Sequence, residues 1–160
     1  NHQLNRKTPL HTRANVAYFG TFGYELDLNK LSDEEISEVK QQITFMKEYR
    51  ELIQFGTFYR LKSPFEGNET AWMIVSEDKK TALVFWYRER NVVNADFTRV
   101  RLQGLDPDLI YRNEYNGTEN YGDELMNLGL LTTDCTAGEP TSEDEPCTDY
   151  ESRIYVLTAK

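Results

Sequence analysis

The feature that most constrains this chain is the stretch Leu31–Tyr59, LSDEEISEVKQQITFMKEYRELIQFGTFY, which carries the strongest helix pattern in the sequence. Ser32 and Glu35 have the spacing of a capping box, in which each side chain hydrogen-bonds the backbone N–H of the other residue. Gly56 is typical of a helix end. The predicted helix carries one apolar stripe, formed by Ile36, Val39, Ile43, Met46 and Ile53.

The chain before this long helix predicts a shorter helix and a link. Proline suits the first helical position, and the apolar spacing after it predicts a helix from Pro9 to about Phe19. A strand over Val16–Phe19 is the alternative. Glycines follow, and Tyr24–Leu28 is then predicted to be a short extended link.

After Gly56 the pattern becomes rich in β-branched and aromatic residues, with turn residues between the runs. The predicted strands are Phe58–Leu61, Thr70–Ser76, Thr81–Arg88, Phe97–Leu102, Leu109–Glu114 and Arg153–Thr158. A short helical turn or loop is expected at Tyr121–Leu130, and a mobile acidic loop at Thr132–Tyr150. Short strands with a returning C-terminal strand predict an antiparallel Greek-key β-sandwich. We therefore expect an α+β fold, with a helical segment in residues 1–55 and the sandwich in residues 56–160.

Two of these strands are joined by the polar residues Glu77–Lys80 and predict a hairpin. With Ser76 opposite Thr81, counting outward pairs Ile74 with Leu83 and Trp72 with Phe85. We expect these two pairs to face the sandwich interior. The second face is also apolar, so we expect both faces to be covered; it carries Met73, Val75, Val84 and Trp86.

Composition excludes several classes of partner. The chain holds 27 acidic and 18 basic residues, a net charge of −9 with no basic stripe, which argues against nucleic-acid and anionic-membrane binding. No apolar run is long enough to span a bilayer. The sequence has no signal peptide and does not begin with Met, so we expect a fragment or processed piece of a cytoplasmic protein.

The two cysteines and two Asn-x-Thr patterns are weak signals. Cys135 and Cys147 flank an acidic loop and could form a disulfide, but two free thiols are favoured because nothing else indicates secretion. Asn68-Glu69-Thr70 and Asn116-Gly117-Thr118 fit the glycosylation pattern, which is short enough to arise by chance.

No motif for nucleophilic, metal or phosphate chemistry is present. His2 and His11 lack partners at metal-ligand spacing, so no metal site is predicted. In an extended segment Glu25 and Asp27 would point to the same side and could form a glycosidase carboxylate pair. An acidic link flanking the long helix is the favoured interpretation of these two residues.

Aromatic residues offer a second candidate site. Trp72, Trp86 and Tyr87 could stack on a sugar, but aromatic residues in the middle of an antiparallel sheet are far more often part of the core. The residues alone therefore predict an architecture and no chemistry.

Several motifs along the chain resemble those of bacterial α-galactosidases of glycoside hydrolase family thirty-six. They are NHQ at residues 1–3, RKTPLHTR at 6–13, GTFGYELD at 20–27, YRELIQ at 49–54, FYRL at 58–61, SPF at 63–65, AWM at 71–73, GLDP at 104–107 and GDELM at 122–126. The first four resemble the closing loop and helices of the family's catalytic barrel, which we expect in residues 1–55, and the others resemble its C-terminal sandwich, which we expect in residues 56–160. The acidic loop at Thr132–Tyr150 does not resemble the family.

The resemblance implies a retaining enzyme that removes terminal α-linked galactose from sugars such as melibiose and raffinose, with two catalytic aspartates, no cofactor and often a tetrameric assembly. Both aspartates lie in Lys-Trp-Asp and Cys-Ser-Gly-Gly-Gly motifs that this chain lacks. No catalytic residue is therefore expected here, and the substrate-binding residues are unknown. The expected partners are the remainder of the barrel, a galactose-terminated oligosaccharide in the parent enzyme, and further copies of the protein. The alternative is a free-standing carbohydrate-binding or interaction module.

Overall fold

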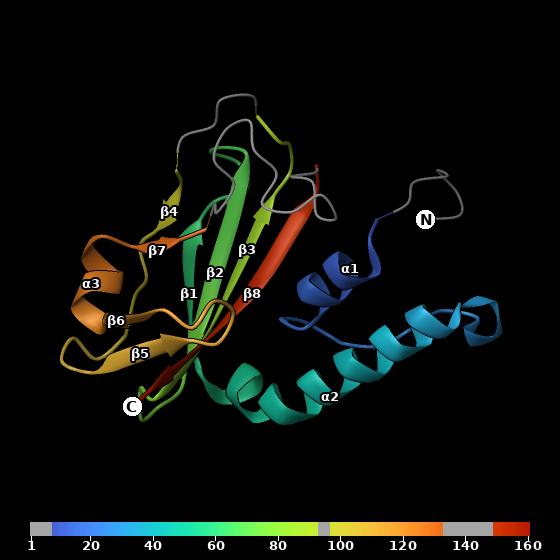
Figure 1. Cartoon of the computed structure of the whole chain (residues 1–160), viewed down its shortest axis with the longest axis horizontal. Helices are drawn as coiled ribbons and strands as arrows, with labels where there is room; N and C mark the ends of the chain where they lie inside the picture. The colour runs from blue at the N-terminus through green and yellow to red at the C-terminus, as the bar shows by residue number, and fades with distance from the viewer. Residues whose placement is uncertain (1–7, 93–96, 133–148) are drawn as a thin grey trace. The chain divides into compact units, whose positions relative to one another are not determined.

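The computed structural model describes residues 8–92, 97–132 and 149–160. The chain divides into two compact units, residues 1–55 and residues 56–160, and each is described by itself. The helical unit contains α1 (Leu10–Ala17), the short 3-10 helix η1 (Leu28–Lys30) and the long helix α2 (Asp33–Phe55) (Figure 1).

The start of α2 is fixed by side chains that bind its free backbone N–H groups. The Ser32 backbone N–H donates to the Glu35 carboxylate at 2.9 Å, and the Glu35 backbone N–H donates to the Ser32 hydroxyl at 3.2 Å. The predicted capping box is therefore confirmed. Acidic residues fill the first turn, where the partial positive charge of the helix N-terminus favours them.

The helix α1 confirms the predicted short helix, and the alternative strand over Val16–Phe19 is wrong. The predicted extended link ends early, because Leu28 already begins η1. The buried residues of α2 are Val39 and Gln42, whereas the other residues of the predicted apolar stripe are only half-buried. Because residue 42 is a polar glutamine, the hydrophobic pattern of the sequence did not indicate that this part of the helix is buried.

The second unit is built on an antiparallel sheet, which confirms the α+β class. Six strands form it in the order β1-β2-β3-β8-β5-β6, and β4 pairs with β7 in a second, two-stranded sheet. The elements are β1 (Thr57–Lys62), β2 (Glu69–Val75), β3 (Thr81–Arg88), β4 (Arg99–Val100), β5 (Ile110–Asn113), β6 (Glu119–Tyr121), α3 (Gly122–Asn127), β7 (Leu130–Leu131) and β8 (Glu151–Ala159). The returning C-terminal strand was predicted, and β8 indeed lies between β3 and β5.

The weakest strand predictions concern the second sheet. The strand expected over Phe97–Leu102 is reduced to Arg99–Val100, which pairs with the two-residue strand β7. The short strands β6 and β7 were not predicted. The helix α3 confirms the helical turn expected within Tyr121–Leu130, whereas most of the acidic loop at Thr132–Tyr150 lies outside the described residues.

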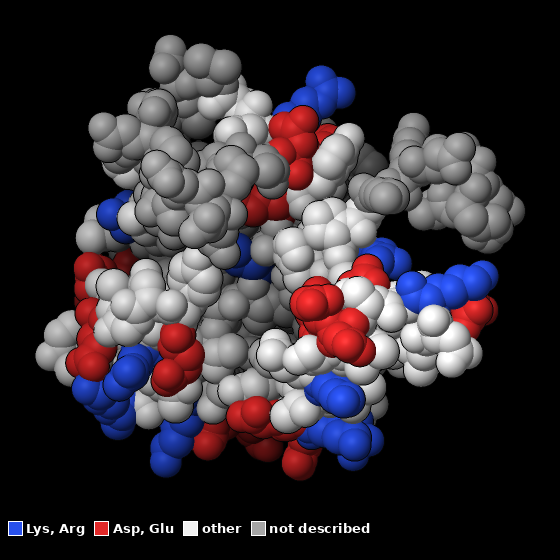
Figure 2. Space-filling view, turned by 45° about the vertical axis from the view of Figure 1, so that its right-hand side comes forward, with Lys and Arg blue, Asp and Glu red and all other residues white. Residues whose placement is uncertain are grey.

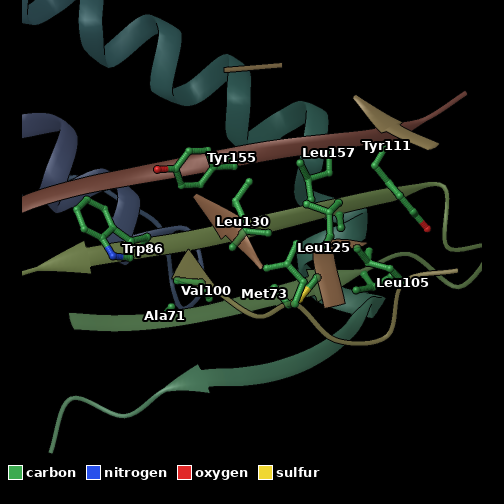
Figure 3. Packing of buried hydrophobic residues seen from close by; sticks show 14 residues of the cluster. Ala71, Met73, Trp86, Val100, Leu105, Tyr111, Leu125, Leu130, Tyr155 and Leu157 are labelled. Atoms are coloured by element: carbon green, nitrogen blue, oxygen red, sulfur yellow. The ribbon is translucent and has the colours of Figure 1, made fainter. Parts of the chain in front are cut away.

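The predicted hairpin register is correct, but the predicted interior face is wrong. Trp72 pairs with Phe85 and Ile74 pairs with Leu83, as expected. The core of the unit, however, is built on the opposite face of these strands, which β4, β7 and α3 cover (Figure 3). That face contributes Ala71, Met73, Val75, Ala82, Val84 and Trp86 to the core. Both faces are apolar, so the sequence pattern could not decide which one the second layer covers.

Gly122 makes a close backbone contact with Asp106 beside this core. A Cβ atom on Gly122 would lie 1.9 Å from the Asp106 carbonyl oxygen, so only glycine fits there. Beside it, the Tyr111 hydroxyl accepts a hydrogen bond from the Asp106 backbone N–H at 3.0 Å and donates to the Lys79 carbonyl at 2.6 Å. The GLDP and GDELM motifs therefore meet at one packing contact.

The inverted face leads to a stability prediction. Trp86 is fully buried in the core cluster, and Trp72 lies on the other face outside that cluster. We expect Trp86→Ala to lower the free energy of unfolding by about 3–5 kcal/mol, as for a large core aromatic residue. Urea titration followed by far-UV circular dichroism measures the change. A smaller loss for Trp86→Ala than for Trp72→Ala would contradict the assignment of the core face.

A second prediction concerns the glycine contact. We expect Gly122→Ala to destabilise the chain by about 1–3 kcal/mol, because the new methyl group overlaps backbone atoms that cannot rotate away. Gly67→Ala is the matched control, since a Cβ atom there meets nothing within 4 Å. Thermal unfolding of both variants tests this, and equal melting temperatures would show that residues 106 and 122 are less tightly packed than described.

Candidate functional site

The helical unit contains a pocket of about 200 Å³ between α1, the segment that follows it, and α2. Its walls are mostly apolar, with the polar side chains of Arg13, Tyr24, Glu25 and Gln42 among the lining residues. Leu10, Ala14, Ala17, Phe22 and Leu26 supply the apolar part. The pocket is large enough for one apolar side chain or a small molecule.

A chain of hydrogen bonds connects the pocket-lining residues Tyr24 and Gln42 with their neighbours in this unit. The Tyr24 hydroxyl donates to the Gln42 side-chain oxygen at 2.6 Å, and the Gln42 side-chain nitrogen donates to the Glu38 carboxylate at 2.7 Å. The Tyr18 hydroxyl donates to the Gln42 backbone carbonyl at 3.3 Å. Both polar ends of the buried Gln42 amide are therefore satisfied, as burial requires.

Aromatic rings surround the same network. The Tyr18 ring stacks on Phe22 with centroids 4.9 Å apart, and Phe22 meets Tyr24 edge-on at 5.3 Å. Tyr18 also contacts Phe45 at 4.8 Å. Burial raises the pKa of Tyr18 strongly, and the nearby Tyr24 and Glu38 raise it further. Burial also raises the pKa of Tyr24, with Glu38 adding to the effect. Both hydroxyls therefore remain protonated donors at neutral pH.

The two residues of the candidate carboxylate pair have different surroundings. The Asp27 carboxylate accepts from the backbone N–H and the side-chain amide of Asn29 at 3.2 and 3.1 Å and so caps η1. Glu25 is exposed and lies among the pocket-lining residues, which do not include Asp27. The structure therefore assigns Asp27 a local structural role.

The sequence offered two histidines as candidate metal ligands and two cysteines as a candidate disulfide. His11 is exposed on α1, and within residues 8–92, 97–132 and 149–160 no group of three His, Cys, Asp or Glu side chains could hold a metal ion. His2, Cys135 and Cys147 lie outside the described residues.

The aromatic candidates do not form an open platform. Trp86 is fully buried in the core, and Trp72 stacks on Phe85 with centroids 4.0 Å apart. Tyr87 is half-buried, and burial raises its pKa, with Glu89 and Tyr150 adding to the effect. The core interpretation of the tryptophans is therefore confirmed for Trp86.

The sequence did not indicate a charged cluster at one end of the sandwich core. Glu151 binds Arg88 and Arg153 with N–O distances of 2.5 Å each, and both guanidinium groups lie over the Trp86 ring, at 5.4 and 6.0 Å. The three charged residues come from the adjacent strands β3 and β8. The pairing of these strands brings Arg88 beside Glu151, which is 63 positions further along the chain. No local motif could therefore have indicated the cluster.

The surface carries both signs of charge. On the face shown in Figure 2, basic and acidic side chains are interspersed among the described residues, with no continuous basic patch. The structure also has no helix, in the part of the chain it describes, with the length and apolar character needed to cross a membrane.

Two family models match the chain in succession. Residues 1–56 match the melibiase family, and residues 69–157 match the C-terminal domain of glycosyl hydrolase family 36. The chain belongs to glycoside hydrolase family 36. The motif-based resemblance is therefore confirmed, and it extends over both units.

Known members of family 36 resemble this chain closely. The α-galactosidase AgaA of Geobacillus stearothermophilus is 52% identical over 130 residues, which is 81% of this chain and 18% of that protein. α-Galactosidase 1 of Pediococcus pentosaceus is 43% identical over 159 residues, or 99% of this chain and 20% of that protein. A crystal structure of a variant of AgaA in complex with 1-deoxygalactonojirimycin has a TM-score of 0.88 and 44% identity, covering 100% of this chain and 21% of its own. This chain thus spans about a fifth of the length of the relatives it matches.

The raised pKa of Tyr18 predicts how stability changes at high pH. An unfolded tyrosine ionises near pH 10, so the unfolded state loses this proton first and stability falls as the pH rises above about 10. We expect Tyr18→Phe to make the stability curve less steep in this range. Urea midpoints at pH values on both sides of 10 measure it, with the exposed Tyr121→Phe as control. Equal slopes in wild type and Tyr18→Phe would contradict the burial of a protonated hydroxyl.

Proposed function

We propose that this chain is the C-terminal part of a retaining α-galactosidase that hydrolyses terminal α-linked galactose from oligosaccharides such as melibiose and raffinose. The observation that carries the proposal is the succession of the two family matches, residues 1–56 and 69–157, in one continuous chain. Relatives from several organisms that match this chain are named α-galactosidases. Structures of two AgaA variants, one in complex with raffinose and one with stachyose, support the substrate class.

The two units have different roles in this proposal. Residues 1–55 are the closing loop and helices of the catalytic barrel, and residues 56–160 are the C-terminal antiparallel sandwich that supports it. The division into units at residue 55 and the boundaries of the two family matches support this assignment. The pocket and the tyrosine network of the helical unit then serve the packing of the barrel.

The catalytic carboxyl groups of the proposed enzyme lie in the rest of the parent protein. A retaining mechanism needs two carboxyl groups about 5–5.5 Å apart, one acting as nucleophile and one as acid and base. Asp27 caps η1, so the one carboxylate pair that the sequence suggested is a poor candidate. We also propose a cytoplasmic homo-oligomer without a cofactor, in which the remainder of the barrel is the principal partner of this segment.

The proposal predicts that the isolated 160 residues do not hydrolyse nitrophenyl α-galactoside, whereas the complete protein expressed from its gene does. A mutant of the complete protein with its nucleophilic aspartate replaced is the control for contaminating activity. Hydrolysis by the repurified isolated chain would contradict the location of the catalytic groups, and an inactive complete protein would overturn the proposed activity.

The alternative, a free-standing carbohydrate-binding module, gives a different result in a galactose titration of the isolated chain. That module requires measurable binding heat, and the α-galactosidase proposal expects none from this segment. The burial of Trp86 and the stacking of Trp72 on Phe85 favour the second outcome.

A further inference from the structure

The sequence contains a single Asn-Gly pair, Asn116-Gly117, and the structure places it in the loop that joins β5 to β6 (Figure 1). Both residues are exposed, and Gly117 has a φ of +73°. A Cβ atom at position 117 would meet nothing within 4 Å, so solvent surrounds this turn. We propose that Asn116 is a site of spontaneous deamidation, which converts it to aspartate or isoaspartate without an enzyme.

The reaction needs only the chain and water. The backbone nitrogen of Gly117 attacks the side-chain carbonyl carbon of Asn116, loses its proton to solvent, and forms a five-membered succinimide ring. The side-chain nitrogen leaves as ammonia. A water molecule then opens the ring at one of its two carbonyl carbons, which gives aspartate or isoaspartate. Glycine allows this attack because it places no side chain beside the attacking nitrogen.

The hydrogen bonds of the loop activate the Asn116 side-chain carbonyl and hold the attacking Gly117 nitrogen in place. The Thr118 hydroxyl and backbone N–H donate to the Asn116 side-chain oxygen at 2.7 and 3.1 Å, and so they polarise its carbonyl group and can stabilise the negative charge that develops there. The Gly117 backbone N–H donates to the Asn113 carbonyl at 2.7 Å. This bond must break before attack, so the folded chain reacts more slowly than the unfolded one.

Two other asparagines, Asn68 and Asn127, are protected from deamidation by hydrogen bonds of their side-chain nitrogens and by the residues that follow them. The Asn68 side chain donates to the Arg90 carbonyl at 2.5 Å and accepts from the Arg90 backbone N–H at 2.9 Å. The Asn127 side chain donates to the Asp123 carbonyl at 2.8 Å. Each is also followed by a residue with a bulky side chain. These two sites therefore serve as internal controls.

Deamidation would change the loop both electrically and geometrically. It adds a carboxylate between Glu114 and Glu119 in the sequence, in a chain whose net charge is already −9. Isoaspartate also adds one carbon to the main chain within the turn that the Asn113 N–H to Thr118 carbonyl bond closes at 2.8 Å. We therefore expect the isoaspartate form to loosen the end of the β5–β6 hairpin.

Peptide mapping by mass spectrometry tests the proposal on the whole chain incubated at mildly alkaline pH. We expect deamidated peptide from Asn116, none from Asn68 or Asn127 over the same period, and faster formation when the chain is held in urea. Gly117→Ala should lose the signal, and Thr118→Val should slow it in the folded chain only. Equal deamidation at Asn116 and the two controls would overturn the proposed site. A rate in Thr118→Val at or above that of the wild type would overturn the role of the hydroxyl.

Discussion

The sandwich unit depends on the burial of one face of its central strands against a second layer. Met73, Val84 and Trp86 are fully buried under the layer formed by β4, β7 and α3 (Figure 3). This layer is weak by itself, since β4 and β7 are each two residues long. Apolar contact with the large sheet therefore stabilises it, and the close approach of Gly122 to the Asp106 carbonyl allows that contact.

The helical unit has fewer buried apolar residues in its interior than the sandwich unit. Its interior includes a polar chain from Tyr24 through Gln42 to Glu38, with stacked aromatic rings around it. Buried polar groups are expensive unless every one is hydrogen-bonded, so this network fixes side-chain positions more strictly than an apolar contact would. Such strictness is consistent with the role proposed for residues 1–55, in which this segment packs against the rest of the catalytic barrel.

Several residues of the family motifs have structural roles in the described part of this chain. A family 36 segment that spans about a fifth of its relatives contains motifs whose described residues serve in caps, turns and close contacts. Asp27 caps a short helix, and Gly122 permits a close contact with the Asp106 backbone. Motifs shared within an enzyme family can therefore mark folding requirements as well as catalytic ones.

Local signals in the sequence determined the elements that local interactions control. The capping box of Ser32 and Glu35, the β2–β3 hairpin and its register all follow from neighbours along the chain or from one short turn, so they could be predicted. The interior face of that hairpin, the buried Gln42 and the cluster of Arg88, Glu151 and Arg153 could not. Each depends on which distant segment covers or pairs with a strand or helix, and a pattern that is apolar on both faces, or polar at a buried position, carries no information about that choice. Only the tertiary structure decided them.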